Sequence, residues 1–207
     1  MPDLAPVLGV LAALVGIADT IPYVRDIVRG KTRPHRGTWL IWGVLAIVVF
    51  WSQRADGASW SLIMAGSQAV LTSLVFLLAI RRGEGGFSAS DAALIALAGV
   101  GVIGWVIVDE PVIAVAGVMV ADLVAAFMMA PKTYRDPGSE TLAMFALASL
   151  GGALGAGAVG TVDPSLLAYP IYYCLGNGAI ALLIYSRRVA LRGAPAHAIV
   201  RAARPAA

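Results

Sequence analysis

Seven long apolar runs dominate this 207-residue chain and decide what it can fold into. A helix needs about 20 mostly apolar residues, each rising 1.5 Å, to cross the roughly 30 Å hydrocarbon core of a bilayer. Because 59% of all residues are apolar and the mean hydropathy is +0.84, we expect an all-α membrane protein with seven transmembrane helices. The predicted spans lie at residues 4–24, 37–53, 58–80, 87–108, 111–130, 140–161 and 165–186.

Basic residues alternate between the two ends of these spans, and the alternation predicts the orientation in the membrane. Of the 15 Lys and Arg residues, all but Arg54 fall in every second connecting segment or in the C-terminal tail. Such residues concentrate on the cytoplasmic side, so we expect an N-terminus outside and a C-terminus in the cytoplasm. No basic residue precedes the first run, so no cleavable signal peptide is expected. Residues 189–207 are predicted to form a flexible cytoplasmic tail.

The first and third basic segments of the chain resemble each other. Each follows one apolar run and precedes the next, and the third and seventh runs both end in a pair of arginines. We therefore expect two parallel three-helix repeats, residues 4–80 and 111–188, with the helix at 87–108 as the linker that restores the orientation of the second repeat. The matched residues are Pro22 and Pro131, Arg25-Asp26 and Arg135-Asp136, Gly30 and Gly138, Thr32 and Thr141, and Arg81-Arg82 and Arg187-Arg188.

This three-one-three layout, with a proline before each repeated loop, resembles the PQ-loop superfamily, which includes the SWEET sugar transporters and their half-size bacterial relatives. Pro22-Tyr23 and Pro131-Lys132 stand where the family has a proline-glutamine pair. The segment PYVRDIVRGKT, followed by TWLIW, is most similar to uncharacterised bacterial members. The resemblance implies a bacterial inner-membrane protein that works by alternating access, with the loop prolines as hinges.

Polar side chains inside the third and seventh spans are candidates to bind a substrate, because such groups usually face a bundle interior or a water-filled cavity. Gln68 lies near the centre of the third span, and Thr72 shares its helical face. Asn177 lies near the centre of the seventh span, where Tyr169 and Tyr173 precede it at intervals of four. Carboxamides suit a polyhydroxylated solute and tyrosine rings suit the apolar face of a sugar, whereas interhelical hydrogen bonding is the structural alternative.

The resemblance implies a similar set of residues. SWEET transporters place asparagines on the third and seventh spans and tryptophans on the second and sixth. Asn177 matches this pattern, and Gln68 takes the place of the other asparagine. Trp39 and Trp42 on the second span could form an aromatic wall, but the sixth span has Phe145 and no tryptophan. For Trp39, anchoring at the membrane interface is the alternative.

Two carboxyl groups and three prolines complete the predicted site. Asp122 lies near the middle of the fifth span and Asp19 near the cytoplasmic end of the first. Desolvation disfavours a charged carboxylate there, so both are candidate proton-coupling residues, with a hydrogen-bonded structural aspartate as the alternative. Pro22, Pro131 and Pro170 each remove a backbone hydrogen bond and are predicted hinges.

Other classes of protein fit the chain poorly. Lys31 and Lys132 both lie in predicted loops, so no retinal Schiff base is expected on the seventh span. Histidines, nucleophiles and carboxylates do not cluster, so we expect neither an enzyme nor a metal site or other cofactor. The charge of the first loop is explained by topology, which argues against a nucleic-acid partner.

We therefore predict a transporter that moves a small polar solute, with sugar as the first candidate, by alternating access between the two repeats. The alternatives are a proton-coupled amino-acid or organic-acid carrier and a ligand receptor on the same fold. The expected partners are a small-molecule substrate and the lipid bilayer. Gly151 and Gly155 on the sixth span have the small-xxx-small spacing, which permits close helix packing and association into a homo-oligomer.

Overall fold

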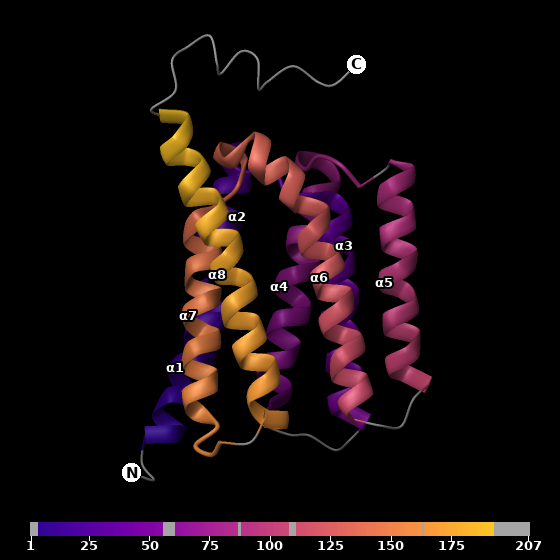
Figure 1. Cartoon of the computed structure of the whole chain (residues 1–207), viewed down its shortest axis with the longest axis vertical. Helices are drawn as coiled ribbons and strands as arrows, with labels where there is room; N and C mark the ends of the chain where they lie inside the picture. The colour runs from indigo at the N-terminus through magenta and orange to yellow at the C-terminus, as the bar shows by residue number, and fades with distance from the viewer. Residues whose placement is uncertain (1–3, 56–60, 87, 108–110, 163, 193–207) are drawn as a thin grey trace.

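A computed structural model describes residues 4–55, 61–86, 88–107, 111–162 and 164–192. Regular structure within these residues is helical, apart from one isolated bridge between His35 and Glu84. The long helices run side by side along one axis of the molecule (Figure 1). The helices are α1 (Leu4–Ala18), α2 (Thr20–Val28), α3 (Arg36–Ala55), α4 (Ser61–Arg82), α5 (Ala89–Ile107), α6 (Pro111–Arg135), α7 (Leu142–Ala158) and α8 (Pro164–Arg192), with a short 3-10 helix η1 (Pro137–Ser139).

The first predicted span is broken into two helices. The prediction of one helix over 4–24 is wrong in this respect, because α1 ends at Ala18 and α2 begins at Thr20, with a turn at Asp19 between them. Pro22 explains the break: it has no N–H to donate to the carbonyl of Ala18, and its ring crowds that carbonyl. The interruption between α1 and α2 therefore lies three residues before the proline that was expected to act as the hinge.

The other two predicted hinge prolines do not end their helices. Pro131 lies inside α6, which continues to Arg135, and Pro170 lies inside α8. Each interrupts one intrahelical hydrogen bond and leaves the helix intact on both sides. Helix α8 runs to Arg192, so the predicted tail began four residues too early, and 193–207 lie outside the described residues.

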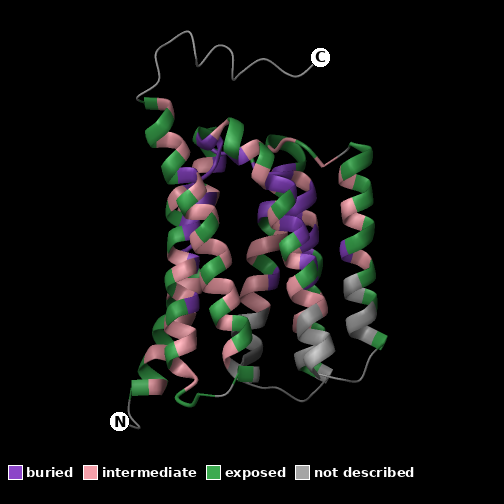
Figure 2. Cartoon of the chain, viewed as in Figure 1, coloured by how far each residue is buried: buried purple, intermediate pink, exposed green. Residues whose placement is uncertain are grey.

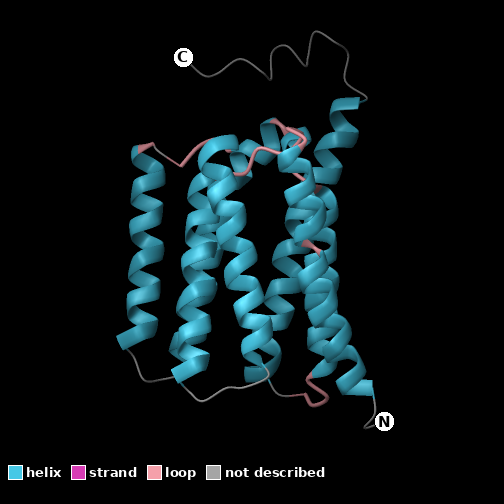
Figure 3. Cartoon of the chain, turned by 180° about the vertical axis from the view of Figure 1, so that it is seen from behind, coloured by secondary structure: helices cyan, strands magenta, loops and turns pink. Residues whose placement is uncertain are grey.

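The helices pack in a pattern that looks the same from either half of the chain. Helix α3 packs on α4 and α7 on α8, while α1 packs on α7 and α3 on α6. If α1, α3 and α4 correspond to α6, α7 and α8, the pairs α1–α7 and α3–α6 are one contact seen from the two halves, as expected around a two-fold axis. Helix α5 lies at the edge of the bundle and packs mainly on α6 (Figures 1 and 3).

Buried residues gather toward one end of the bundle (Figure 2). Segments 25–36, 81–86, 132–141 and 187–192 meet there, and we call it the basic end because they carry twelve of the Lys and Arg residues, whereas Arg54 lies near the opposite end of α3. Several of the buried side chains at this end are polar, which soluble cores rarely allow. They include Thr32, His35, Thr38, Thr133, Ser139, Glu140 and Thr141.

The outer surface of the bundle is apolar over much of its length. Exposed large apolar side chains follow α1 from Leu4 to Ile17, α5 from Leu97 to Ile107 and α8 from Ile171 to Val189. Two segments of the described chain are long and apolar enough to cross a membrane. They are Leu4–Val28, in which an 18-residue window has a mean hydropathy of 2.1, and Leu167–Arg192, in which such a window has 1.5. The fold thus buries several polar side chains at the basic end and exposes apolar side chains along α1, α5 and α8.

Candidate functional site

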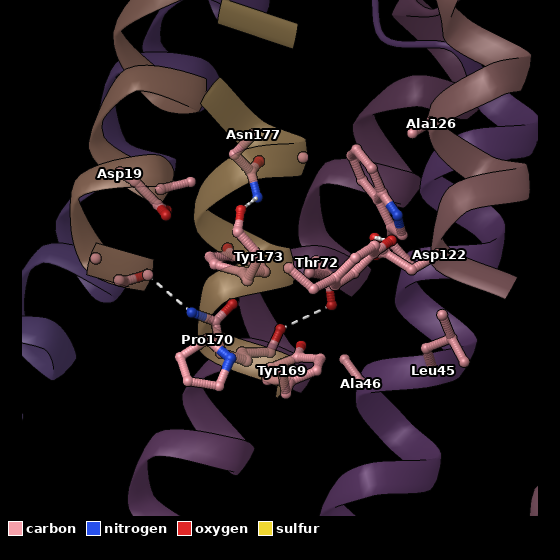
Figure 4. Close-up of a pocket in the computed structure, with 18 of the residues that line it drawn as sticks. Asp19, Leu45, Ala46, Thr72, Asp122, Ala126, Tyr169, Pro170, Tyr173 and Asn177 are labelled. Atoms are coloured by element: carbon pink, nitrogen blue, oxygen red, sulfur yellow. Dashed lines mark hydrogen bonds between the residues drawn. The ribbon is translucent and has the colours of Figure 1, made fainter. Parts of the chain in front are cut away.

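A cavity of about 490 Å³ lies inside the bundle, in the size range of small-molecule sites. Helices α1, α2, α3, α4, α6, α7 and α8 supply lining residues, whereas α5 supplies none of those described. Figure 4 shows residues from both halves of the chain converging on it. The predicted site residues that line it are Asp19, Trp42, Gln68, Thr72, Asp122, Tyr169, Pro170, Tyr173 and Asn177.

The two carboxamides of the cavity wall already have partners. Gln68 Nε2 donates to the carbonyl of Gly16 on α1 at 2.8 Å, and Asn177 Nδ2 donates to the carbonyl of Tyr173 one turn earlier at 2.9 Å. Thr72 Oγ1 donates to the carbonyl of Gln68 at 2.7 Å. The bond from Gln68 is the interhelical contact that the sequence left open as an alternative. Each amide oxygen still offers an acceptor to a bound molecule.

Asp122 is held by a residue that the sequence reasoning missed. Tyr172 Oη donates to Asp122 Oδ2 at 2.6 Å, which joins α8 to α6 across the cavity wall. The signal was present, because Tyr172 follows Tyr169 by three positions and Tyr173 follows it by four, and both spacings share one helical face. The spacing of four alone selects Tyr173 and Asn177 and leaves Tyr172 out.

Asp19 lies in the break between α1 and α2 and is almost completely buried. Its Oδ1 accepts a hydrogen bond from Thr20 Oγ1 at 2.9 Å. Figure 4 shows Asp19 and Asp122 on opposite sides of the cavity, with Tyr173 and Asn177 between them in that view. The broken helix therefore turns a carboxyl group into the cavity from one half of the chain, while α6 supplies the second from the other half.

Aromatic rings close the cavity toward the basic end. The ring centroids of Tyr23 and Trp39 lie 4.9 Å apart, those of Trp39 and Trp42 lie 5.1 Å apart, and Phe145 meets Tyr23 edge-on at 6.2 Å. Trp39 Nε1 donates to Tyr23 Oη at 3.0 Å. Since Trp39 is only 1% exposed, anchoring at a membrane interface is wrong for this residue. Tyr169, on the α8 wall of the cavity, remains 46% exposed.

A buried ionic cluster lies directly beyond these rings, and we call Tyr23, Lys132 and Glu140 the latch. Tyr23 Oη donates to Glu140 Oε2 at 2.9 Å, and Lys132 Nζ pairs with Glu140 Oε1. The Glu140 side chain is fully buried and that of Lys132 is 10% exposed. Burial raises the pKa of Glu140, and the ammonium group of Lys132 acts in the opposite direction. The contacts of the Glu140 carboxyl group thus reach from α2 to α6.

The repeated loops also contact each other. Thr32 Oγ1 and Thr141 Oγ1, which the sequence aligns as equivalents, lie 2.6 Å apart. Equivalent residues meet in this way only close to a two-fold axis. Arg82 Nη1 donates to the carbonyls of Ile27 and Val28 at 3.1 and 2.6 Å, and Arg188 Nε donates to that of Pro137 at 3.0 Å.

Arg82 therefore binds the backbone that follows Pro22, and Arg188 binds the backbone that follows Pro131. The second arginine of each pair makes the same kind of contact in both repeats. Gly30 and Gly138 differ, however, since Gly30 has a left-handed φ of 71° and Gly138 lies in η1.

No protein-family profile, curated protein or solved structure matches this chain. The chemistry of the cavity and the contacts that close it are therefore the basis for assigning a function.

Proposed function

We propose that this chain is a seven-span membrane carrier that moves a small polar solute by alternating access between two three-helix repeats. The first repeat comprises α1 to α4, α5 is the linker, and α6 to α8 form the second. The sequence resemblance to PQ-loop and SWEET-like transporters supports this architecture. The sugar that the resemblance implies stays a prediction.

Helix lengths and surface chemistry support seven spans. The helices from α3 to α8 have 17 to 29 residues and Leu4–Val28 has 25, close to the roughly 20 that a bilayer requires. Exposed apolar side chains on α1, α5 and α8 would face lipid. In this proposal the basic end faces the cytoplasm of a bacterial inner membrane, with the N-terminus outside.

One observation carries the proposal: the cavity lies between the two halves and is closed at one end by contacts between their equivalent loops. The latch joins α2 to α6 and to Glu140, and the two threonines join the loops near the apparent axis. Rocking of one half against the other would break these contacts and open the cavity to the basic end. The proline beside the break between α1 and α2 lies where such a movement would bend the chain.

Uptake into proteoliposomes tests the proposal. We expect saturable uptake of at least one solute from a panel of sugars, amines, amino acids and organic acids, with empty liposomes as the control. A variant that links the halves, Thr32→Cys with Thr141→Cys in a Cys174→Ser background, should lose that uptake when oxidised and regain it on reduction. Ligand binding without movement of any solute would instead favour a receptor on the same fold.

Proton coupling is a second candidate, and the Asp122–Tyr172 hydrogen bond inside the cavity favours it. We expect Asp122→Asn to abolish any acceleration of uptake by a pH gradient, because an amide cannot exchange a proton. The measurement is the ratio of uptake rates with and without the gradient, with Tyr172→Phe as the matched variant that keeps the carboxyl group. If Asp122→Asn retains the wild-type ratio, Asp122 does not couple transport to protons.

A further inference from the structure

The charge of the cavity wall is one-sided. Its described lining residues include the carboxyl groups of Asp19 and Asp122 but no Lys, Arg or His. Neutral groups surround them: the hydroxyl groups of Thr20 and Tyr172 donate to Asp19 and Asp122, and the Trp42 indole N–H also acts on Asp122. A carboxylate inside a membrane protein is costly unless a cation or a proton accompanies it. A wall of this composition repels organic acids and favours a positively charged molecule.

Aromatic side chains surround the same space. Tyr169 and Tyr173 stack with centroids 6.1 Å apart and an interplanar angle of 27°, while Trp39 and Trp42 meet edge-on. All four line the cavity, as does Tyr172. Aromatic faces attract cations, and several rings around one cavity are the usual means by which proteins bind substituted ammonium groups. The rings therefore favour the same charge as the carboxyl groups.

Trp42 indicates that the bound molecule also carries a hydrogen-bond acceptor. Its indole nitrogen is buried and has no hydrogen-bond partner among the described residues, although Trp42 lines the cavity. A buried donor without an acceptor costs free energy that a bound molecule can recover by offering an oxygen. The indole N–H also acts on the neighbouring Asp122 carboxyl group, so it marks the same part of the cavity wall as that carboxyl group.

From these three features we infer that the cavity binds a small organic ammonium compound that also carries an oxygen acceptor, such as an amino alcohol. The ammonium group lies between Asp19 and Asp122 against the aromatic rings, and the oxygen accepts from Trp42. This assignment rests on the proposed function in that it names the solute of the same carrier. With a neutral sugar in the cavity, both carboxyl groups would depend on protons alone for neutralisation.

Binding to the purified full-length chain in detergent tests the inference without requiring transport. Four probes separate charge from shape: choline, its uncharged analogue dimethylbutanol, tetramethylammonium and glucose. We expect saturable quenching of tryptophan fluorescence by choline, weaker binding of tetramethylammonium, and at least about thirtyfold weaker binding of dimethylbutanol, the factor typical of losing one partner of a buried charge pair. Glucose should not compete with choline.

Substitutions of the two carboxyl groups test where the ammonium group of choline binds. Asp122→Asn and Asp19→Asn should each weaken choline binding by about thirtyfold, whereas Asp91→Asn, which changes a carboxyl group outside the cavity, should leave it unchanged. Trp42→Phe should weaken choline but not tetramethylammonium, because only choline has an oxygen for the indole N–H. Circular dichroism of each variant shows whether it has folded, and the comparison of the four probes on the unaltered chain depends on no variant.

The outcomes separate this inference from the proposed function. Choline binding that depends on Asp122, with no uptake into proteoliposomes, would support the inference and count against a carrier. Saturable glucose binding with no response to choline, or equal binding of choline and dimethylbutanol, would overturn the inference and leave the carrier intact. Absence of any choline binding to the folded chain would also overturn it.

Discussion

Replacing Glu140 by alanine should destabilise the closed bundle by about 3–5 kcal/mol, the usual cost of removing one partner from a buried ion pair. The substitution leaves the Lys132 ammonium group, with a side chain only 10% exposed, without its buried carboxylate partner. It also removes the acceptor of the Tyr23 hydroxyl group. A thermal melt of the purified chain followed by circular dichroism should show a clear fall in the melting temperature.

Two matched variants identify the cause of that loss. Glu84→Ala removes a carboxylate that lies 3.8 Å from Lys132 Nζ but is 34% exposed, so we expect a loss below about 1 kcal/mol. The double variant Glu140→Met, Lys132→Met removes both charges and should be much more stable than Glu140→Ala, because an apolar pair of similar volume is often tolerated where an ion pair was buried. If Glu140→Ala and the wild type have the same melting temperature, the latch does not hold the basic end closed.

The cavity wall was predicted from the sequence because it depends on local spacing. Tyr169, Tyr173 and Asn177 recur at intervals of four, and Gln68 and Thr72 do the same, so each set had to share a helical face. The long apolar runs predicted helices, and polar side chains within such helices usually face the interior of the bundle. The structure places all five around one cavity.

The latch was not predicted because it depends on how loops pack. Glu140 stands in a short polar segment of the sequence, where an acidic residue is usually solvated, and nothing local indicates that it is fully buried. Its burial follows from the meeting of α2, α6 and η1 at the basic end. Asp19 was placed correctly near the end of the first span, but the break that turns it into the cavity arises from Pro22 acting on the preceding turn.

Glycine spacing on α7 illustrates the same limit. Gly151 and Gly155 have the expected small-xxx-small pattern, yet a Cβ at either position would make only ordinary contacts, at 3.6 Å from Val15 and from Pro170 respectively. The glycine that permits close packing is Gly152, where a Cβ would lie 2.6 Å from the backbone nitrogen of Cys174. Spacing alone does not reveal which face of a helix meets its neighbour.

Gly152→Ala should therefore push α7 and α8 apart. The added methyl group would lie 2.6 Å from the nitrogen and 2.8 Å from the Cα of Cys174, and backbone atoms cannot rotate away. We expect a loss of about 1–3 kcal/mol, the usual cost of overpacking, and more with Gly152→Val. The separation would also stretch the 2.8 Å hydrogen bond from Ser149 Oγ to the Cys174 carbonyl and displace the α8 wall of the cavity.

Gly155→Ala is the matched control, three residues further along the same helix. Its Cβ would lie 3.6 Å from that of Pro170, so the helix-favouring effect of alanine, worth roughly 1 kcal/mol relative to glycine, meets no steric opposition. Melting temperatures of the two variants should shift in opposite directions. Equal shifts would mean that α7 and α8 are not in close contact at Gly152. Gly152, Tyr173 and Asn177 all line the cavity, so solute binding by Gly152→Ala tests whether the separation of α7 and α8 changes the shape of the cavity.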